Sequence, residues 1–331
     1  MGKFVSFGEV LMRLSTPGAG RFEQARQFNI TYAGGEANVS SALAYWGHKT
    51  VHVTKFPDSP IGRAAAQYLQ FHGVDISEIR YGGERIAVYY LETGAALRPS
   101  QIVYDRYHSS FAEADPAEYD WEEILKDASW FHWAGITPAL SQKAADALLE
   151  GIRVANRLNI TVSGDIFYRS NLWKYGKKPS DILPALTEGT NLVIANPINL
   201  KDIYGIESSS FVDGCEKFRE AFPSITHVVD TYRTSVSASH NLLRAYLWNG
   251  KEVLETSDID INPIVDRVGG GDAFIAGLIH GLITFNDEQR ALEFGVAASA
   301  LKHTIEGDAL ISTEAEVEAI RQGDTTGRIK R

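Results

Sequence analysis

The sequence predicts an α/β fold: a mostly parallel central sheet with helices on both faces, and a small β-lid beside it. Strand-like and helix-like segments alternate along nearly all of the chain, which is typical of parallel sheets. With 331 residues, of which 44% are hydrophobic, we expect one domain over 1–331 with a sizeable core. The predicted strands are 51–56, 130–133, 160–163, 192–195 and 227–230, and the clearest helices are 61–72, before Gly73, and 141–158, capped by Ser141.

Two regions interrupt this alternation, at about 12–33 and 84–107. Both are rich in aromatic, β-branched and turn residues and lack helical periodicity. Within the second region, 87–92 and 101–104 form the expected strands of a hairpin around 94–100. An antiparallel piece beside a parallel sheet is either a lid over a site or an ordinary meander at the sheet edge. The pattern alone leaves both open.

The composition limits the classes of partner. The formal net charge is −10 and the sequence pI is about 5.4, and no basic stripe of the kind that binds nucleic acid is present. No apolar run approaches the roughly 18 residues that span a membrane. The single cysteine, Cys215, excludes an intrachain disulfide and fits a reducing cytosol. We therefore expect a cytoplasmic protein with no nucleic-acid or membrane partner, in which any anionic substrate meets locally concentrated positive charge.

The strongest local signal is the segment 266–274, Asp-Arg-Val-Gly-Gly-Gly-Asp-Ala-Phe. It follows a strand-like run, 259–265, and precedes an apolar helix predicted at 273–285. Three successive glycines let the backbone present several N–H groups to one point, where the helix dipole also favours an anion. A carboxylate at this position, Asp272, would repel a phosphate. This cost is justified if the carboxylate has a function there, such as taking a proton from an attacking hydroxyl. The alternative is structural, with Asp272 as a helix N-cap after a tight turn.

A second glycine pair and two arginines add weaker signals. Gly34 and Gly35 open a predicted helix, where a ligand can approach the backbone closely, and Asn38 can point polar groups at hydroxyls. Arg106 and Arg169 follow aromatic strand ends, and ligands of open α/β sheets bind outside the carboxyl ends of the strands. A guanidinium can grip a carboxylate in a bidentate manner, although a lone arginine is most often a solvated surface group.

Together these segments resemble the ribokinase-like (PfkB-type) carbohydrate kinases over nearly the whole chain. Gly-Gly-Glu-Ala-Asn-Val at 34–39 is similar to the N-terminal sugar motif of that family, and Gly-Gly-Gly-Asp at 269–272 to its C-terminal signature. The resemblance is greatest to the 2-keto-3-deoxygluconate kinase subgroup. It is carried by 135–140, by Tyr104-Asp105-Arg106 with 108–110, and by Tyr168-Arg169 with Leu172-Trp173.

The resemblance implies a reaction and a set of site residues. ATP, with Mg²⁺, would donate its γ-phosphoryl group to the terminal hydroxyl of 2-keto-3-deoxygluconate or a related sugar acid. Asp272 would be the general base, and the N–H groups of Gly269, Gly270 and Gly271 would form an anion hole. The residues implied to line the sugar-acid site are Gly34, Gly35, Asn38, Tyr89, Tyr104, Arg106, Ile136 and Arg169, with both arginines near the substrate carboxylate.

The resemblance also implies a nucleotide site and a dimer. Segments 230–235 and 295–303 would flank the nucleotide, and the β-lid would join two copies into a homodimer. The metal ligands stay unidentified. The residues implied to contact the nucleotide are Thr231, Arg233, Ser235, Gly269, Gly271 and Ala298.

The chain departs from the family pattern at several positions. Arg267 stands where the family has Thr, and Gly270 where it has Ala; both are compatible with an anion hole. Asn199 replaces a glutamate tied to Mg²⁺ and phosphate, and the expected nucleotide loop, 230–235, has no glycine. Two alternatives therefore stay open: a kinase for another sugar, such as fructose or ribose, and a sugar-binding homologue with impaired catalysis.

Other enzyme classes lack their motifs. Gly8-Glu9-Val10 after the first predicted strand does not match the glycine pattern of dinucleotide-binding folds. The sequence contains no Gly-x-x-x-x-Gly-Lys-[Ser/Thr] loop and no His/Cys cluster with zinc spacing.

Overall fold

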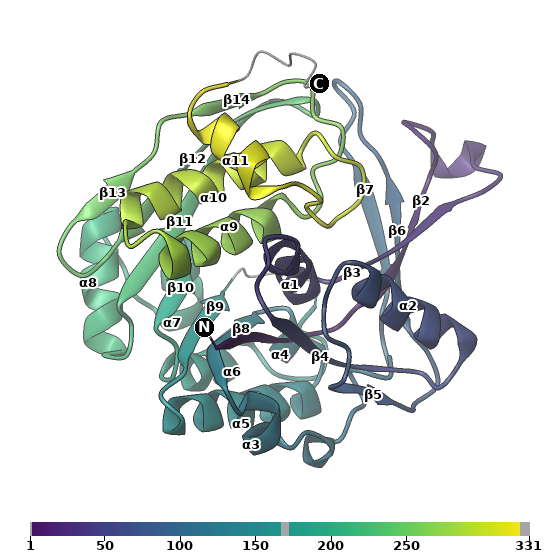
Figure 1. The fold of residues 1–331 in the computed structure, drawn as a ribbon, viewed down its shortest axis with the longest axis horizontal. Helices are drawn as coiled ribbons and strands as arrows, with labels where there is room; N and C mark the ends of the chain where they lie inside the picture. The colour runs from purple at the N-terminus through teal and green to yellow at the C-terminus, as the bar shows by residue number, and fades with distance from the viewer. Residues whose placement is uncertain (1, 167–171, 325–331) are drawn as a thin grey trace.

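A large twisted sheet runs through the centre of the molecule (Figure 1) in the computed structural model, which describes residues 2–166 and 172–324. Its strands are β1 (Lys3–Phe7), β4 (Thr50–Phe56), β5 (Ile79–Tyr81), β8 (Ala128–Ala134), β9 (Thr161–Asp165), β10 (Leu192–Ile194), β11 (His227–Ser237), β12 (His240–Trp248), β13 (Val253–Glu255) and β14 (Ile259–Ile261). They lie in the order β13-β12-β11-β10-β9-β8-β1-β4-β5, with β14 paired to β12. All neighbours from β5 to β11 are parallel, which confirms the predicted mostly parallel sheet.

The far edge of this sheet differs from the prediction. Strand β11 does not end near 230 but continues to Ser237 and pairs antiparallel with β12, so 230–235 is a strand and not a loop. The reason is a partner strand: backbone groups of this segment are satisfied by β12, whatever the local turn propensity. The predicted run 259–265 is shorter than expected, and only Ile259–Ile261 is a strand.

Helices cover both faces of the large sheet (Figure 1). One layer contains α1 (Gly35–Tyr45), α9 (Gly270–Thr284), α10 (Glu288–Lys302) and α11 (Glu314–Arg321), and its apolar side chains form one buried cluster with the strands. The other layer forms a second cluster and contains α3 (Trp121–Leu125), α4 (Thr137–Leu140), α5 (Gln142–Arg157), α6 (Pro179–Thr187), α7 (Pro197–Tyr204) and α8 (Phe211–Ala221). The remaining helical segments are α2 (Pro60–Phe71), which packs against β4, and the short turns η1 (Phe22–Gln24) and η2 (Pro116–Glu118).

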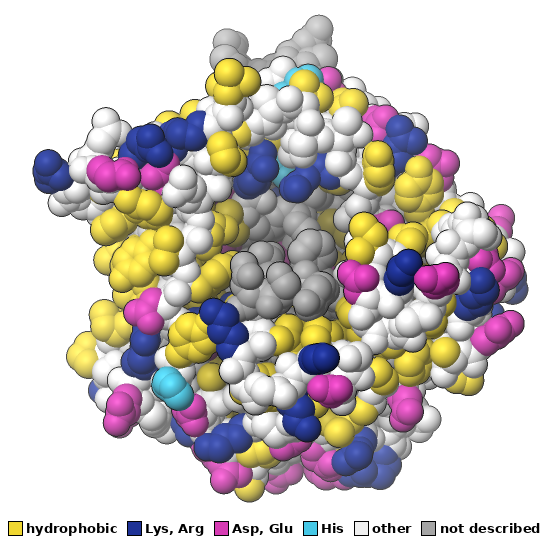
Figure 2. Space-filling model, turned by 180° about the vertical axis from the view of Figure 1, so that it is seen from behind, with side chains coloured by type: hydrophobic (Ala, Val, Ile, Leu, Met, Phe, Trp, Pro, Cys, Tyr) yellow, Lys and Arg dark blue, Asp and Glu magenta, His cyan; other side chains and the backbone are white. Residues whose placement is uncertain are grey.

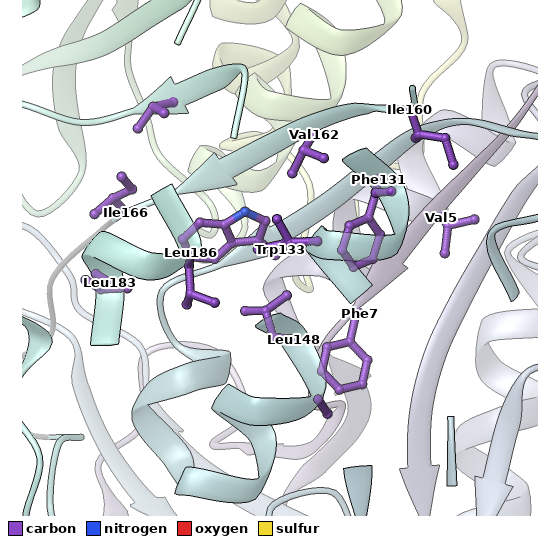
Figure 3. Packing of buried hydrophobic residues seen from close by; sticks show 14 of the residues in the cluster. Val5, Phe7, Phe131, Trp133, Leu148, Ile160, Val162, Ile166, Leu183 and Leu186 are labelled. Atoms are coloured by element: carbon purple, nitrogen blue, oxygen red, sulfur yellow. The ribbon is translucent and has the colours of Figure 1, made fainter. Parts of the chain in front are cut away.

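Figure 3 shows the packing below the strand ends. Phe7 on β1 and Phe131 and Trp133 on β8 are essentially inaccessible to solvent, and Leu148 from α5 packs with them. A Cβ on Gly164 of β9 would lie only 2.6 Å from the Trp133 ring, so glycine is needed for the indole to lie flat across the strand. Burying each such side chain contributes about 1.5–3 kcal/mol. The site residues that follow β1 and β8 therefore start from a rigid base.

The two interrupting regions form one separate four-stranded sheet, called the small sheet below. Its strands are β2 (Leu11–Ser15), β3 (Asn29–Ala33), β6 (Ala87–Glu92) and β7 (Gln101–Asp105), in the order β3-β2-β6-β7. The predicted hairpin around 94–100 is confirmed as β6 and β7. The central pair, β2 and β6, is parallel, because both strands leave the carboxyl edge of the large sheet in the same direction.

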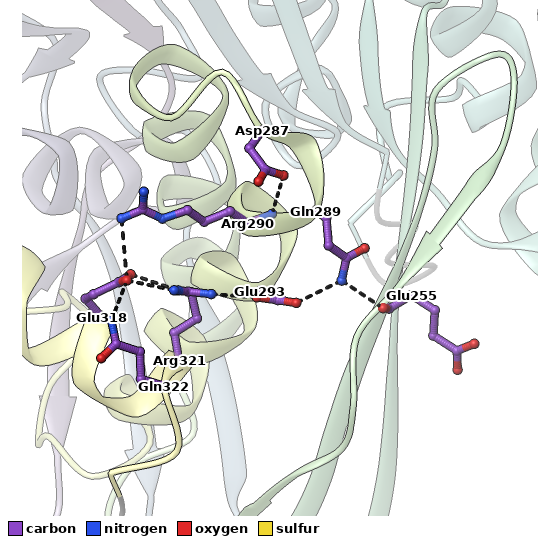
Figure 4. Close-up of polar contacts among 8 residues, drawn as sticks. All are labelled: Glu255, Asp287, Gln289, Arg290, Glu293, Glu318, Arg321 and Gln322. Carbon is purple, nitrogen blue, oxygen red and sulfur yellow. Dashed lines mark hydrogen bonds and ion pairs between the residues drawn. The ribbon is translucent and has the colours of Figure 1, made fainter.

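Polar contacts fix α10 and α11 on the outside (Figure 4). Arg321 on α11 donates to Glu293 on α10 and to Glu318 on its own helix, each at 2.8 Å. Gln289 on α10 donates to the carbonyl oxygen of Glu255 in β13, at 3.1 Å. Each partly exposed pair contributes only about 0.2–1 kcal/mol, but several together hold one helix to two neighbours. Within the described ranges, no helix combines the length and the apolar character needed to cross a bilayer.

Candidate active site

The candidate site lies where the direction of the chain reverses within the large sheet. From β1 the chain adds β4 and β5 on one side and later β8 to β11 on the other. The carboxyl ends of β1 and β8 are adjacent, and a crevice opens at such a switch point in open α/β sheets. The chain enters this region through Gly8 and Glu9 after β1, and through Gly135 and Ile136 after β8. Ile136 is partly exposed there, as a residue lining a site must be.

The three-glycine turn is held in a conformation that needs glycine. Gly269 has φ +83°, and a Cβ there would overlap the carbonyl oxygen of Asp308. A Cβ on Gly270 would lie 2.5 Å from the His303 ring, whereas Gly271 faces open space and is exposed. The first N–H groups of a helix have no partner within it. The Gly270 N–H donates to the Arg267 carbonyl oxygen of the turn at 3.4 Å, so the exposed Gly271 is the glycine that offers a backbone donor at the positive end of α9.

The start of α9 corrects one prediction. The helix begins at Gly270, with Gly269 as its N-cap, so Asp272 is the third helical residue. The predicted start at 273, with Asp272 as a possible N-cap, is wrong, because the glycines adopt helical geometry once the turn is closed by Asp308 and His303. Asp272 is therefore not the N-cap residue, and it is partly exposed.

Both glycine motifs meet at Asp272. The Asn38 amide Nδ2 donates to Oδ2 of Asp272 at 2.7 Å. A Cβ on Gly35 would lie 3.5 Å from Oδ1 of the same carboxylate. The first turn of α1 therefore lies directly opposite the first turn of α9. Sequence reasoning named all these residues, and the structure brings them together.

A second carboxylate of the sugar motif, Glu36, was not predicted as a site residue. Its Oε1 accepts from the Thr137 hydroxyl at 2.7 Å and from the Ala134 amide at 3.1 Å, and it fills the space above Gly8. Complete burial raises the pKa of Glu36 to about 7, and the charge of Asp272 adds to the rise. Glu36 thus joins α1 to the end of β8. The sequence did contain a signal for Glu36, because it lies in the first turn of a helix that opens with glycine.

The small sheet is fixed to the glycine turn by buried charges. Arg13 of β2 donates through Nη2 to Asp266 at 2.5 Å and through Nη1 to Asp308. The Tyr89 hydroxyl of β6 donates to the other oxygen of Asp308 at 2.6 Å. All four side chains are buried. Tyr89 was predicted to line the sugar site, whereas Arg13 was missed, although an arginine within the apolar strand Leu11–Ser15 was a signal.

The predicted carboxylate-binding arginines have different outcomes. Arg106 is buried and pairs with Glu9, its Nη2 lying 2.6 Å from Oε2, and its guanidinium lies 5.6 Å from the Tyr104 ring centroid. The Ser109 hydroxyl donates to the other oxygen of Glu9. In this structure the charge of Arg106 is therefore already neutralised within the protein. Tyr104 is 36% exposed and accessible to a ligand. Arg169 lies outside the described residues.

The predicted nucleotide side contains one correction. Thr231, Arg233 and Ser235 alternate along β11 and are exposed on it. Burial lowers the pKa of Arg267, and the positive charge of Arg233 lowers it further. Arg267 donates through Nη2 to the carbonyl oxygen of Ala238 at 2.8 Å. Ala298, by contrast, is inaccessible: its Cβ packs against Gly277 between α10 and α9. The prediction that Ala298 contacts the nucleotide is wrong, since 295–303 turns this residue toward the neighbouring helix.

The residue that replaces the family glutamate has a structural role. Asn196 caps α7 by accepting from the Asn199 amide at 2.9 Å, and the Asn199 side chain accepts from the Asn196 amide at 3.3 Å. Within residues 2–166 and 172–324, no group of three or more His, Cys, Asp or Glu side chains is arranged to hold a metal ion.

Comparisons with known proteins agree with this geometry. The model of the pfkB family of carbohydrate kinases matches residues 1–315. A 2-dehydro-3-deoxygalactonokinase of Haloferax volcanii is 32% identical over 98% of both chains. The crystal structure of 2-dehydro-3-deoxygluconokinase from Thermotoga maritima has a TM-score of 0.93 and 38% identity, covering 98% of this chain and 100% of that one. A ribokinase-type protein of E. coli, in complex with ATP and Mg²⁺, has a TM-score of 0.79 and 20% identity over 98% and 100% of the two chains, and so shares the fold.

The fold is therefore the ribokinase-like α/β fold, and the class of protein is a carbohydrate kinase. The chain belongs to the PfkB family of carbohydrate kinases.

Replacing Glu36 by Gln tests its burial through the pH dependence of stability. Folded protein holds this proton up to about pH 7, whereas an unfolded glutamate releases it near 4.5. Folding therefore takes up a proton in this window, and stability falls as the pH rises through it. Glutamine does not titrate. We expect the free energy of unfolding of Glu36→Gln, relative to wild type, to rise by about 3 kcal/mol between pH 4.5 and 8, measured by urea denaturation.

The matched control is Glu150→Gln, an exposed glutamate of α5. It should show no comparable change with pH. A Glu36→Gln difference that stays constant from pH 4.5 to 8 would mean that Glu36 is ionised throughout and not enclosed as described.

Proposed function

We propose that this kinase transfers the γ-phosphoryl group of ATP to the terminal hydroxyl of 2-keto-3-deoxygluconate or a closely related sugar acid, with Asp272 as the general base. The observation that carries the proposal is the meeting of the two glycine-opened helices at Asp272, where the Asn38 amide donates at 2.7 Å. This carboxylate lies between two positive helix ends and remains partly exposed.

The reaction follows from these positions. The substrate hydroxyl transfers its proton to the Asp272 carboxylate while its oxygen forms a bond to the γ-phosphorus, and the bond between that phosphorus and the bridging oxygen breaks to release ADP. Charge spreads over the equatorial phosphoryl oxygens in this transition state. Backbone N–H groups of the glycine turn, pre-oriented at the start of α9, stabilise that charge without reorganising.

The identity of the acceptor rests on two lines of support. Relatives that match nearly the whole chain act on 2-dehydro-3-deoxy sugar acids. Tyr104 offers an exposed aromatic surface next to the Arg106 guanidinium. A kinase for a neutral sugar is the second candidate, and the Arg106–Glu9 pair favours it, because a neutralised guanidinium attracts a carboxylate less strongly.

Magnesium would enter with the nucleotide. Mg²⁺ commonly keeps several waters and binds through substrate phosphates with one or two carboxylates, so a dedicated protein cage is not required. Asn199 is neutral and engaged in capping α7, and we assign it no metal contact. The phosphates would instead meet the positive charges of Arg233 and Arg267 beside the glycine turn.

The two sides of the small sheet differ in their contacts and exposure. Thr31, Arg13, Tyr89 and Tyr104 form one row across its strands, on the side that contacts the glycine turn. The opposite side carries the row Ile30, Leu14, Tyr90 and Val103, of which Ile30 is 59% and Val103 53% exposed. Figure 2 shows hydrophobic side chains gathered on this side of the molecule. We propose a homodimer that buries this row. Sedimentation would test it by comparing the oligomeric state of wild type with that of Val103→Glu, which places a charge in the row.

The single cysteine supports a cytoplasmic location. Cys215 is buried and unpaired, and burial raises the pKa of its thiol to about 12. An unreactive thiol of this kind needs no oxidising compartment.

A panel of acceptors tests the proposed substrate class. Purified protein with MgATP should release ADP fastest with 2-keto-3-deoxygluconate or its galactonate epimer, and slower by about tenfold or more in kcat/KM with fructose and ribose, which lack the carboxylate. Equal or faster turnover of a neutral sugar would move the assignment to the second candidate. Binding of sugar acids by calorimetry without ADP release would indicate a homologue that has lost catalysis.

Replacing Asp272 by Asn tests the general base. Asparagine keeps the size and the contact with Asn38 but cannot take the proton. We expect kcat to fall at least about a hundredfold, while calorimetric affinity for the sugar acid changes little. Asp146→Asn on α5, far from the glycine turn, is the control and should keep wild-type turnover. Full activity in Asp272→Asn would remove this residue from the mechanism.

Replacing Arg233 by Ala tests the proposed phosphate contact. The side chain is exposed on β11, so its charge is screened, and we expect the KM for ATP to rise about fivefold. The KM for the sugar acid should stay unchanged, and Arg153→Ala on α5 should alter neither constant. A rise in the sugar KM alone would place Arg233 at the acceptor instead.

A further inference from the structure

One fully buried charged side chain has no part in the reaction as described so far. Lys302, the last residue of α10, is completely inaccessible to solvent. Its ammonium donates to the carbonyl oxygen of Ile305 at 3.0 Å and to that of Asp266 at 3.4 Å. Its direct partners in the described part of the chain are thus backbone carbonyls. The Lys302 ammonium is thus a cation of the protein itself, bound by backbone carbonyls next to the glycine turn.

An ammonium in this position is costly. Burial lowers the pKa of Lys302, because it disfavours the charged form, while the negative charges of Asp266 and Asp308 act in the opposite direction. The charge of Asp272 also raises this pKa, so the ammonium lies within electrostatic reach of the catalytic base. A methionine would fill a similar volume without the desolvation penalty. The charge is therefore the feature that needs a reason.

A reason for the buried charge of Lys302 is its contact with Asp266, the first residue of the glycine turn. Asp266 begins the glycine turn, and its backbone N–H donates to the His303 carbonyl at 3.2 Å. Its carboxylate accepts from the Val268 amide at 3.0 Å and from the Gly307 amide at 3.1 Å. With Arg13 on the same carboxylate, every polar group of Asp266 has a partner, and Lys302 occupies the carbonyl. The residue from which the turn departs is thereby fixed at each end.

The last turn of α10 also supports the glycines directly. The ring of His303 lies against Gly270, where a Cβ would come within 2.5 Å, and the His303 Nδ1 lies 2.7 Å from the Ser299 carbonyl oxygen. The helix itself is held by the buried cluster beneath it and by the polar contacts to α11 and β13 shown in Figure 4. A group at the end of α10 is therefore a rigid point from which to position the turn.

We propose that Lys302 is a positioning residue of the anion hole, whose buried ammonium binds the Asp266 and Ile305 carbonyls and so holds the glycine turn with the backbone donor of Gly271 aligned with the migrating phosphoryl group. Its positive charge is also felt at Asp272, in an interior where electrostatic interactions are strong. The inference rests on the proposed kinase function for its effect on turnover.

The test compares variants that separate charge from volume. Lys302→Met keeps most of the volume and removes the charge, Lys302→Gln keeps one donor group, and Lys302→Ala opens a space for added methylammonium. Lys143→Met, a half-exposed lysine of α5, is the matched control. Each folded variant is measured for kcat, for both KM values, for sugar-acid affinity and for MgADP affinity by calorimetry.

We expect Lys302→Met to lose about tenfold or more in kcat, less than the hundredfold typical of removing a direct oxyanion donor. Its sugar-acid affinity should stay within about twofold, and Lys302→Gln should be intermediate. Millimolar methylammonium should restore part of the kcat of Lys302→Ala, with no effect on wild type or on Lys143→Met. MgADP affinity should fall in Lys302→Met and be regained in Lys302→Ala with methylammonium.

Two results would overturn the proposal. One is a folded Lys302→Met with wild-type kcat and MgADP affinity, which would reduce Lys302 to a helix-end contact. The other is a loss that extends equally to sugar-acid affinity and that methylammonium does not restore, which would be a general structural defect. If wild type phosphorylates no sugar, the proposed function fails, but the MgADP measurements still decide the role of Lys302. If Lys302→Met does not fold, Lys302→Gln and rescued Lys302→Ala decide it.

Discussion

The hydrogen bond between Asn38 and Asp272 is the contact on which the site depends. It joins residues 234 positions apart and brings the first turns of α1 and α9 face to face. Both helices direct the positive end of their dipole toward this point. In the proposed mechanism, the fold thus supplies positive potential from two directions to the Asp272 carboxylate and to the phosphoryl group beside it. Without the large sheet to set the positions of both helices, neither glycine motif would form a site.

Charge in this acidic protein is arranged in two kinds of group. Arg13 and Lys302 are buried with Asp266 and Asp308, where they balance one another and hold the backbone of the glycine turn. Arg233 and Arg267 lie more openly beside the turn, and their mutual repulsion is a feature that a phosphate would relieve. The buried group fixes geometry, and in the proposed function the open group meets the phosphates. This is how a chain with net charge −10 would bind an anion.

The small sheet is attached to the glycine turn by buried polar contacts. Arg13 and Tyr89, on its two central strands, both donate hydrogen bonds to the Asp308 carboxylate beside the glycine turn. Breaking one partner of such a buried pair is strongly unfavourable, about 3–5 kcal/mol, because a charge is left without compensation. The base of the small sheet and the glycine turn therefore behave as one unit.

Local sequence patterns predicted several strands and helices of the large sheet, the hairpin of β6 and β7, both glycine motifs and the residue proposed as the base, because periodicity and glycine spacing report backbone geometry directly. They did not determine where α9 starts or that 230–235 extends a strand, since both depend on distant partners: Asp308 and His303 in one case, β12 in the other. Nor did they show that Ala298 faces a helix, or that Arg106 is neutralised by Glu9. Pairing of buried charges is a property of contacts between remote segments, and only the tertiary structure decides it.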